Sequence, residues 1–451
     1  MRSILPKSLI ALAQVCPTPL YVVGGSVRDF LANLTPNTPS RDLDICAAID
    51  AQTFASLATE NGFTVRALFK NTGTIKLQDE NKNDFEFSCF RSDKYVRGTH
   101  VPVETCFTDD ITLDARRRDF TINAIYYDIR ADKFVDPLDG ITAIKEKRLT
   151  TVAPAKKVFS EDGLRLMRLA RFTATLGFSP DNDCLLGATH NAALIKDISP
   201  ERIFTELTAI LQADEKYGIQ NGHYQGLLLL DQTRVLDYIL PELTLGRGIP
   251  GRPDFHNYDV LGHSLRAVYY APKHLRLAAL LHDIGKPFCY HRDGNTHAHA
   301  VEGEPIARKI LHRLKAPTRT IDRVCDLVAW HMYDFNCQTG ENKLRRFFVE
   351  HYDLLDDLLL VKQADFSACK DNVSIAPTRK KWLSLLSQMR QEHAPLCLKE
   401  LALNGKDLLN VGIPPSRVSQ LLKKALLHAA INPSDNQKDK LIAIVLREEN
   451  I

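Results

Sequence analysis

The chain has 451 residues, of which 44% are hydrophobic and 25% are charged, and its formal net charge is +3. This length exceeds what one hydrophobic core usually serves, so we expect roughly two to four domains. The small net charge means that any surface for nucleic acid must be a local patch.

The N-terminal segment carries a positive charge and a short apolar run, which also occur in signal peptides and lipoproteins. Pro6 interrupts the run, and Val15 stands where a small residue would precede the cysteine, so we predict an amphipathic helix before the first strand. No later stretch approaches the ~20 apolar residues of a bilayer span. Ten scattered cysteines without a C-x-x-C pair argue against a zinc ribbon or a disulfide framework. We therefore expect a cytoplasmic protein without membrane contact.

Short β-branched and aromatic runs recur in the N-terminal part and predict a mixed sheet. Strands are expected at 20–25, 43–49, 63–69, 73–77, 84–90 and 123–129, with helices at 27–34 and 51–62. From Gly163 onward, apolar residues recur at helical spacing and strand signals fade. The predicted fold class is α+β. We divide the chain into a small mixed-sheet head (1–130), a helical neck and body (131–245), a further helical domain (246–372) and a helical tail (373–451).

Two carboxylates occur one residue apart in the second predicted strand. Asp42 and Asp44 project from the same face of that strand. Two carboxylates on one face repel unless a cation lies between them, and hard oxygen ligands suit Mg²⁺ that bridges nucleotide phosphates. A lone D-x-D is more often a solvated strand face, so the interpretation depends on its neighbours.

Gly24 and Gly25 follow the first predicted strand and precede a helix. Glycines at such a turn let backbone N–H groups approach a phosphate without a Cβ in the way. Arg28 is then placed to reach a phosphate. Together with the carboxylate pair, this turn predicts a metal-dependent nucleotidyl transfer site, in which positioning and charge neutralisation supply most of the catalysis.

The run GGSVRD, followed by RDLD, resembles the head motif of class II nucleotidyltransferases, the family of CCA-adding enzymes and bacterial poly(A) polymerases. Further motifs of that family follow in its order. They are Arg117–Ala124, Asp136–Gly140, Glu161–Phe172 and Glu201–Leu207. The resemblance implies that the nucleotide contacts are made by Gly24, Gly25, Arg28, Arg118, Asp119, Asn123, Asp162, Arg165, Arg168 and Arg171.

The fourth motif has its own physical interpretation. We expect Ser160 to cap a helix whose first turn holds Asp162, with Arg165 on the same face. The alternative is a surface ion pair worth well under ~1 kcal/mol. Cytosine and adenine both present an amino group beside a ring acceptor, so a carboxylate and a guanidinium side by side would admit CTP and ATP and reject the inverted edges of uracil and guanine. The resemblance assigns this templating role to the pair.

The residues leave three points open. Glu86, on a neighbouring strand, is either a third carboxylate of the site or an outward-facing strand residue. The Gly-Thr strand start at 73–74 and the lack of a long basic tail favour CCA addition over poly(A) synthesis. The segment Tyr95–Pro102 departs from the flexible loop that helps the family switch from CTP to ATP. We expect full CCA addition, with a CC-only or A-only enzyme as the alternative.

Histidine and aspartate residues recur in the helical part at His263, His282, Asp283, His299, His331 and Asp365. The adjacent His-Asp pair lies at a predicted helix end closed by Gly285, where both side chains can turn into one cavity. Imidazole and carboxylate ligands suit Mn²⁺, Fe, Ni²⁺, Co²⁺ or Zn²⁺, and such an ion activates water for attack on phosphoesters. A lone histidine is usually a surface or core residue, but six ligand-type residues in this order indicate a metal centre.

This pattern resembles the HD phosphohydrolase domain, which some bacterial CCA-adding enzymes carry. The resemblance implies phosphatase, 2′-nucleotidase or 2′,3′-cyclic phosphodiesterase activity, with a primary ligand set of His263, His282, Asp283 and Asp365. His299 and His331 are expected to support that set, although the register of the third histidine could shift to His297. Lys286 is either a substrate-phosphate contact or a surface charge.

The sequence thus predicts an enzyme that adds CCA to the 3′ end of tRNA without a template, using CTP, ATP and Mg²⁺ at Asp42 and Asp44. A metal-dependent phosphohydrolase site is expected to accompany it. The alternative from another class is a phosphohydrolase whose head only binds RNA, and the intact carboxylate pair speaks against it.

Overall fold

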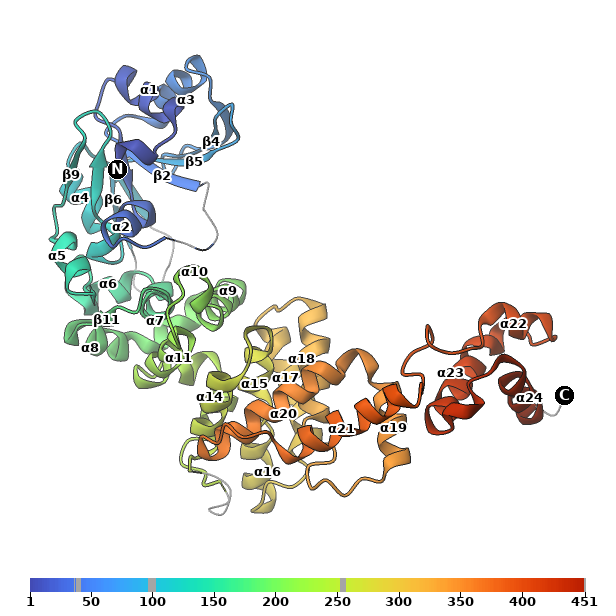
Figure 1. Ribbon diagram of the computed structural model, residues 1–451. Coiled ribbons are helices and arrows are strands. Elements are labelled where there is room, and N and C mark those ends of the chain that lie inside the picture. Colours follow the sequence, from blue (N-terminus) through green and yellow to red (C-terminus); the bar gives the residue numbers. More distant parts are fainter. Residues whose placement is uncertain (36, 38–41, 96–102, 252–256, 450–451) are drawn as a thin grey trace. The chain divides into compact units, whose positions relative to one another are not determined.

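The computed structural model describes residues 1–35, 37, 42–95, 103–251 and 257–449 (Figure 1). It divides into two compact units: one comprises Met1–Thr244 and Arg313–Ala316, the other Leu245–His312 and Pro317–Ile451. Arg41 and most of the altered loop, residues 96–102, lie outside the described residues. Among the helices that the structure describes, none is both long and apolar enough to cross a membrane.

The first unit contains a seven-stranded sheet of order β3-β4-β5-β2-β1-β8-β9. Its strands are β1 (Tyr21–Val23), β2 (Asp42–Ala47), β3 (Thr64–Phe69), β4 (Thr74–Gln78), β5 (Asp84–Cys89), β8 (Tyr126–Asp128) and β9 (Lys133–Val135). β2 and β5 pair in parallel, and the other neighbours pair antiparallel. The mixed sheet and its six predicted strands are confirmed, with β9 as an addition at the edge.

Strand alternation decides which face of this sheet holds the carboxylates. On β5, Phe85 and Phe87 are buried while Asp84 and Glu86 are exposed. Phe87 stacks on Phe54 of α3 (Ala51–Glu60), with ring centroids 3.7 Å apart. Because successive side chains point to opposite faces, the apolar residues pack beneath α3 and the acidic residues face away from it.

The remaining elements of the first unit are mostly helical, as predicted. Two short pairs, β6 (Arg91–Lys94) with β7 (Glu104–Phe107) and β10 (Arg148–Leu149) with β11 (Ser179–Pro180), complete the strands. Its helices are α1 (Lys7–Val15), α2 (Gly25–Leu31), α3 (Ala51–Glu60), α4 (Ile111–Arg116), α5 (Gly140–Lys145), α6 (Ala155–Glu161), α7 (Leu164–Leu176), α8 (Asn182–Asn191), α9 (Pro200–Leu211), α10 (Asp214–Tyr217), α11 (Gly222–Gln232), α12 (Leu236–Ile239) and α13 (Pro241–Thr244).

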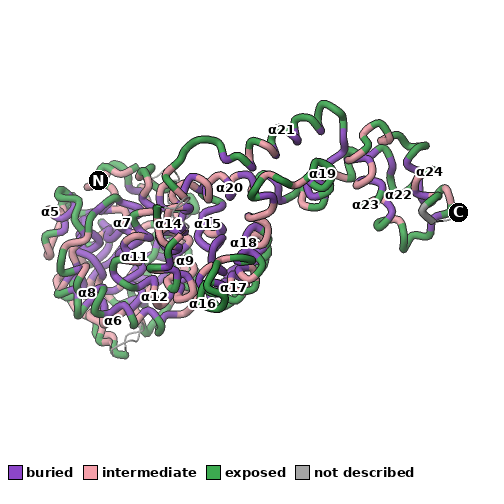
Figure 2. The backbone as a smooth tube through the Cα atoms, turned by 90° about the horizontal axis from the view of Figure 1, so that it is seen from below, coloured by how far each residue is buried: buried purple, intermediate pink, exposed green. Residues whose placement is uncertain are grey.

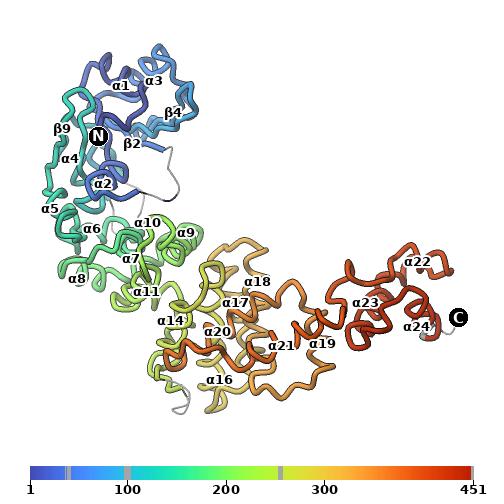
Figure 3. Tube along the Cα trace, viewed as in Figure 1, coloured from blue at the N-terminus to red at the C-terminus, as the bar shows by residue number. Residues whose placement is uncertain are grey.

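The second unit is helical in its described residues. Its helices are α14 (Val260–Tyr270), α15 (Arg276–Leu281), α16 (Lys286–Asp293), α17 (His299–Arg313), α18 (Thr318–Trp330), α19 (Glu341–Glu350), α20 (Leu355–Lys370), α21 (Pro377–Gln391), α22 (Gly405–Asn410), α23 (Pro415–Ile431) and α24 (Lys438–Glu449). Figure 3 shows that α14 and α20, distant in the sequence, lie side by side. In the C-terminal part, α23 buries Leu421, Ala425 and Ala429 against its neighbours (Figure 2).

Candidate functional site

A pocket of about 390 Å³ in the first unit brings together all the residues that the sequence predicts to contact a nucleotide. Asp44 lines it too, whereas Asp42, two residues earlier on β2, is not part of its wall. The sequence reasoning missed four lining residues: Leu164, Phe172, Arg202 and Lys216. Basic side chains outnumber acidic ones in the lining, which suits an anionic triphosphate.

The carboxylates of Asp42, Asp44 and Glu86 lie on the neighbouring strands β2 and β5, near the centre of the sheet. Asp42 and Asp44 are exposed on β2, and the parallel register places Glu86 of β5 directly opposite Asp44. Desolvation by the surrounding protein atoms, together with repulsion from the carboxylates of Glu86 and Asp42, raises the pKa of Asp44. The positive charge of Arg118 acts in the opposite direction. Carboxylate oxygens suit a hard divalent cation, although Asp42, Asp44 and Glu86 are not among the groups of described residues whose donor atoms all lie within 4.8 Å of one another.

Gly24 makes a close approach to this cluster. Its φ is +80°, and a Cβ built there would lie 3.1 Å from Oδ2 of Asp44. A side chain would therefore be strained by the backbone conformation and would crowd the carboxylate. This geometry explains why a glycine stands beside Asp44, while its expected role in binding a phosphate stays a prediction.

Arg28 is buried and held in one orientation. Its Nη1 donates to Oδ1 of Asn123 at 2.8 Å, and its Nε and Nη2 donate to Oδ1 of Asp29 at 2.9 and 2.6 Å. The hydroxyl of Tyr217, from α10, donates to Asp29 at 2.5 Å. Asp29 therefore ties the glycine motif internally, and Arg28 is a pre-oriented cation at the pocket wall.

Asp119 connects the second motif to the fourth. Burial acts to raise the pKa of this carboxyl, but Arg168 and the hydrogen bond from Asn123 hold the pKa of Asp119 well below its usual range. Arg168 Nε donates to it at 2.7 Å. Arg168 and Arg171 both lie over the Phe172 ring, 5.2 and 4.6 Å from its centroid. Asp119 thus orients the guanidinium of Arg168 beside the pocket, while Glu206 accepts from Nε of Arg171 at 2.7 Å.

The predicted helix start at the fourth motif is wrong. Ser160 lies inside α6, which ends at Glu161, and Asp162 is an extended residue between α6 and α7. Its Oδ1 accepts from the backbone N–H of Leu164 at 2.9 Å, so Asp162 rather than Ser160 binds the free N–H groups of the second helix. Residues 155–176 contain no proline, and the break in the helix after Glu161 was not predicted.

Arg165 and Asp162 nevertheless line the same pocket. Arg165 Nη1 donates to Glu161 at 2.9 Å and to the carbonyl of Val158 at 3.0 Å. Its guanidinium also lies 5.6 Å from the ring centroid of Tyr95, the described residue that begins the altered loop. The ion pair of this arginine is with Glu161, not with Asp162, so both groups of the proposed templating pair are fixed by other partners.

Asp114 is a structural residue that the sequence reasoning missed. It is fully buried, and it accepts from Arg117 at 2.7 Å, from Arg118 at 3.0 Å and from the Tyr126 hydroxyl at 2.7 Å. Burial opposes the charged form, but the two arginines lower the pKa of Asp114 to about 2. Its spacing of three and four residues from the arginines was the signal that could have revealed it.

We expect Asp114→Asn to lower the free energy of unfolding by about 2 kcal/mol at neutral pH, because one pKa unit corresponds to about 1.4 kcal/mol. The native pKa is depressed, so the stabilisation is fully present above the unfolded pKa near ~4 and is lost as the pH falls towards 2. Urea unfolding of both proteins at several pH values measures it. Asp109→Asn, an exposed neighbour, is the control. A difference between the two proteins that does not narrow in acid would contradict this origin.

The second unit holds a cluster of six imidazole and carboxylate side chains from distant segments, five of them buried and Asp365 half-buried. They are His263, His282, Asp283, His299, His331 and Asp365. As predicted, the helix before the His-Asp pair ends there, at Leu281. A Cβ on Gly285 would lie 2.1 Å from the carbonyl oxygen of His299, so this glycine allows the turn to pack against α17. His299, and not the exposed His297, occupies the cluster.

Three of these histidines have a defined ring orientation. Nδ1 of His282, His299 and His331 lies 2.7–2.8 Å from a backbone carbonyl oxygen. A carbonyl only accepts, so each Nδ1 carries the hydrogen and Nε2 of the neutral ring keeps a lone pair. Nε2 of His299 is 3.2 Å from Nε2 of His331. Two facing lone pairs repel unless a cation or proton lies between them, and this orientation is usual for histidine metal ligands.

Asp283 lies between two groups of donors. Its Oδ2 is 3.3 Å from Nε2 of both His263 and His282, and its Oδ1 is 3.1 and 3.6 Å from Nε2 of His299 and His331. Asp283 belongs to two triads of donors, one with His263 and His282 and the other with His299 and His331. Each triad could hold a metal ion. Sequence order predicted the six residues but not that one carboxylate is shared.

A cavity of about 1080 Å³ adjoins the cluster. Lys286 lines it and pairs with Oδ2 of Asp283 at 2.5 Å, so it is a cavity residue rather than a surface charge. Much of the rest of the wall is aromatic or apolar, and it includes Tyr258, Tyr290, Met332, Phe335 and Phe366. An apolar cavity that ends in a few convergent polar groups is typical of a small-molecule site.

Three family models match the chain. The model of a "Poly A polymerase head domain" matches residues 20–150, and that of a "Probable RNA and SrmB- binding site of polymerase A" matches residues 177–245. The HD domain model matches residues 260–365. The first range contains the carboxylates of the sheet, and the last contains the whole His/Asp cluster.

Relatives of known name cover most of the chain. The A-adding tRNA nucleotidyltransferase of Deinococcus radiodurans is 30% identical over 429 residues, which is 90% of each chain. The multifunctional CCA protein of Tolumonas auensis is 31% identical over 314 residues, 66% of this chain and 70% of that protein. The fold is similar to that of the Bacillus stearothermophilus CCA-adding enzyme solved with CTP, with a TM-score of 0.64, 23% identity and coverage of 99% and 100%.

Proposed function

The chain belongs to the family of tRNA nucleotidyltransferases and poly(A) polymerases, and on that premise we propose that it adds CCA to the 3′ end of tRNA with CTP and ATP. The observation that carries the proposal is the single pocket in which Asp44, the Gly24–Gly25 turn, and Asp162 with Arg165 all meet. Carboxylates for a metal ion, a phosphate cradle and a base-reading pair are the parts that template-independent nucleotidyl transfer needs.

The residues divide the work of the reaction. Asp42 and Asp44 would hold Mg²⁺, and the bound ion would neutralise charge on the phosphates. The tRNA 3′-hydroxyl would lose its proton to solvent and bond to the α-phosphate, and pyrophosphate would leave. Glu86, opposite Asp44, is proposed as a supporting carboxylate. Arg28, Arg168 and the other cations of the wall bind and orient the triphosphate. The proposed site therefore acts mainly by positioning.

We expect Asp162→Ala to reduce incorporation of CTP and ATP by about 10²-fold, because a hydrogen bond to a charged group contributes ~1.5–3 kcal/mol. Selectivity against UTP and GTP should fall as well, since the carboxylate that repels their ring edge is lost. Single-nucleotide incorporation into tRNA that lacks CCA measures both. Glu161→Gln is the matched variant: it loosens Arg165 but leaves Asp162, so its effect should be smaller. Unchanged selectivity in Asp162→Ala would refute the templating role.

Addition of the terminal A alone is the second candidate function. It is favoured by the A-adding relative, which matches 90% of this chain, and by the departure of the loop 95–102 from the family pattern. Two tRNA substrates separate the candidates, one ending before CCA and one ending in CC. An enzyme that uses only the second substrate, with ATP, adds A alone.

For the second unit we propose metal-dependent phosphohydrolysis at the His/Asp cluster. The cluster is supported as a metal site by its buried, carbonyl-bound histidines and by the HD domain match. A divalent transition metal such as Mn²⁺, Co²⁺, Ni²⁺, Fe or Zn²⁺ suits these ligands and would activate water for attack on a phosphoester. Lys286 is proposed to bind the phosphate of the substrate.

A further inference from the structure

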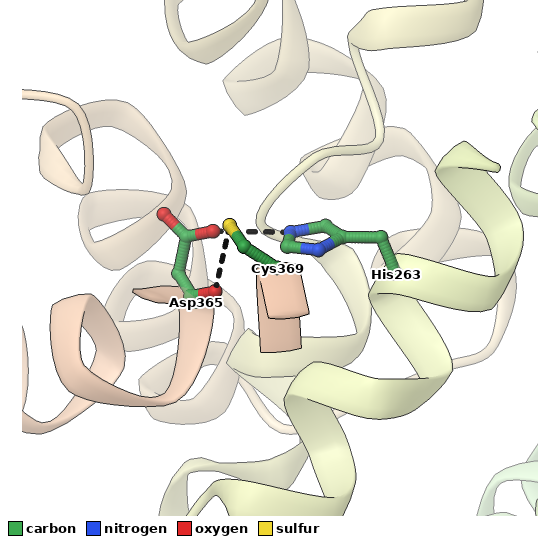
Figure 4. Close-up of side chains that lie close together, drawn as sticks. All are labelled: His263, Asp365 and Cys369. Carbon is green, nitrogen blue, oxygen red and sulfur yellow. Dashed lines mark hydrogen bonds and ion pairs between the residues drawn. The ribbon is translucent and has the colours of Figure 1, made fainter. Parts of the chain in front are cut away.

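We propose that Cys369 is a thiolate ligand of the metal ion held by His263 and Asp365, a role that rests on the metal centre proposed above. Cys369 lies one turn after Asp365 on α20, and residues four apart share a helix face. Donor atoms of His263, Asp365 and Cys369 all lie within 4.8 Å of one another. Figure 4 shows the three side chains converging from α14 and α20.

The position of the thiol distinguishes it from a packing cysteine. Cys289 and Cys325 are sealed among helices, whereas Cys369 is partly exposed and lines the cavity beside His263. Its Sγ lies 3.3 Å from the backbone carbonyl oxygen of Asp365, a contact within one helical turn that leaves the sulfur next to the metal-binding carboxylate. Oδ1 of Asp365 lies 3.0 Å from Nε2 of His263. The sulfur is therefore next to two donor atoms that are already in contact with each other.

A sulfur donor changes which metal the centre selects. Thiolate favours Zn²⁺, Co²⁺ or Fe²⁺ over Mg²⁺ and Mn²⁺, whereas a centre of imidazole and carboxylate alone is less selective. When the ion binds, the S–H bond breaks, the proton leaves to solvent and the sulfur lone pair forms the bond to the metal, so no oxidant or reductant is needed. The proposal thus assigns this centre to the thiophilic divalent metals.

The test is the near-ultraviolet spectrum of the full-length protein loaded with Co²⁺, because a sulfur-to-cobalt bond gives a charge-transfer band that nitrogen and oxygen ligands do not. We expect the band in the wild type, its loss in Cys369→Ser with Co²⁺ still bound, and its retention in Cys397→Ser, a partly exposed cysteine that does not line the cavity. The Kd for Zn²⁺ should rise by about 10-fold or more in Cys369→Ser, and that for Mn²⁺ should change little.

The outcomes distinguish a centre that binds metal without Cys369 from a protein that binds no metal. Bound Co²⁺ without the band in the wild type, or a band that persists in Cys369→Ser, would overturn the role of the thiol and leave the centre intact. Absence of bound Co²⁺ in the wild type would overturn both. Alkylation followed by mass spectrometry gives a second readout, because metal should protect Cys369 from the reagent and leave Cys397 reactive.

Discussion

Replacement of Asp42 and Asp44 by asparagine should reduce nucleotide addition to tRNA by about 10³-fold or more. The loss of a metal-binding carboxylate pair removes several kcal/mol of transition-state stabilisation, and each ~1.4 kcal/mol is a factor of ten. Both side chains are exposed on β2, so the amide should change the free energy of unfolding by no more than about 0.5 kcal/mol. Initial rates with CTP and ATP on tRNA lacking CCA measure the effect.

The sheet supplies a matched control for this experiment. Asp84 is the register partner of Asp42 on β5 and is also exposed, but its Oδ1 accepts from Nε2 of Gln78 at 2.9 Å, so Asp84→Asn should retain full activity. Equal losses of activity in the Asp42/Asp44 variant and in Asp84→Asn would mean that the substitutions disturb the strands rather than metal binding by Asp42 and Asp44. Phosphohydrolysis at the His/Asp cluster should persist in both variants.

Asp283→Asn should abolish phosphohydrolysis, with an expected loss of about 10³-fold or more. Asp283 contacts both histidine groups, so its amide weakens both triads at once. The amount of bound metal per protein, measured after dialysis, should fall together with the hydrolysis of phosphomonoesters and 2′,3′-cyclic nucleotides. Removing the metal from the wild type with a chelator should have the same effect.

The buried position of Asp283 calls for a control on folding. Nucleotide addition by the first unit should remain in the variant, and its helical circular dichroism should match the wild type. Glu302→Gln, on α17 one turn after His299 and outside the cluster, should keep both metal and activity. Full metal content with full hydrolysis in Asp283→Asn would refute the proposed centre.

Local patterns predicted the strands well because one face of the sheet is buried. The alternation in DFEFSCF corresponds to β5, with Phe85 and Phe87 inside, and the run LDICAAI overlaps β2. The break between α6 and α7 was not predicted, although the Asp162-Gly163 pair is a turn signal; Asp162 is extended there and accepts from the N–H of Leu164. The strand β9 was missed because none of its three residues at the sheet edge is buried, whereas the equally short β1 and β8 are mostly buried.

Motif order predicted which residues would gather, and the structure adds how they are held. The resemblance placed Arg118 at the nucleotide, but its buried partner Asp114 was overlooked, although it stands four residues before that arginine. Likewise, the HD pattern predicted Asp365, whereas only the structure places Cys369, on the same helix α20, beside His263. Contacts between segments about a hundred residues apart leave no periodic signal in the chain.

The most direct test of the central proposal is extension of a tRNA transcript that lacks CCA, with Mg²⁺ and with CTP and ATP, each alone and together. We expect two added residues with CTP alone, and three added residues ending in A with both nucleotides, after which extension stops. No extension with both nucleotides, or an adenosine tail of unlimited length, would contradict it.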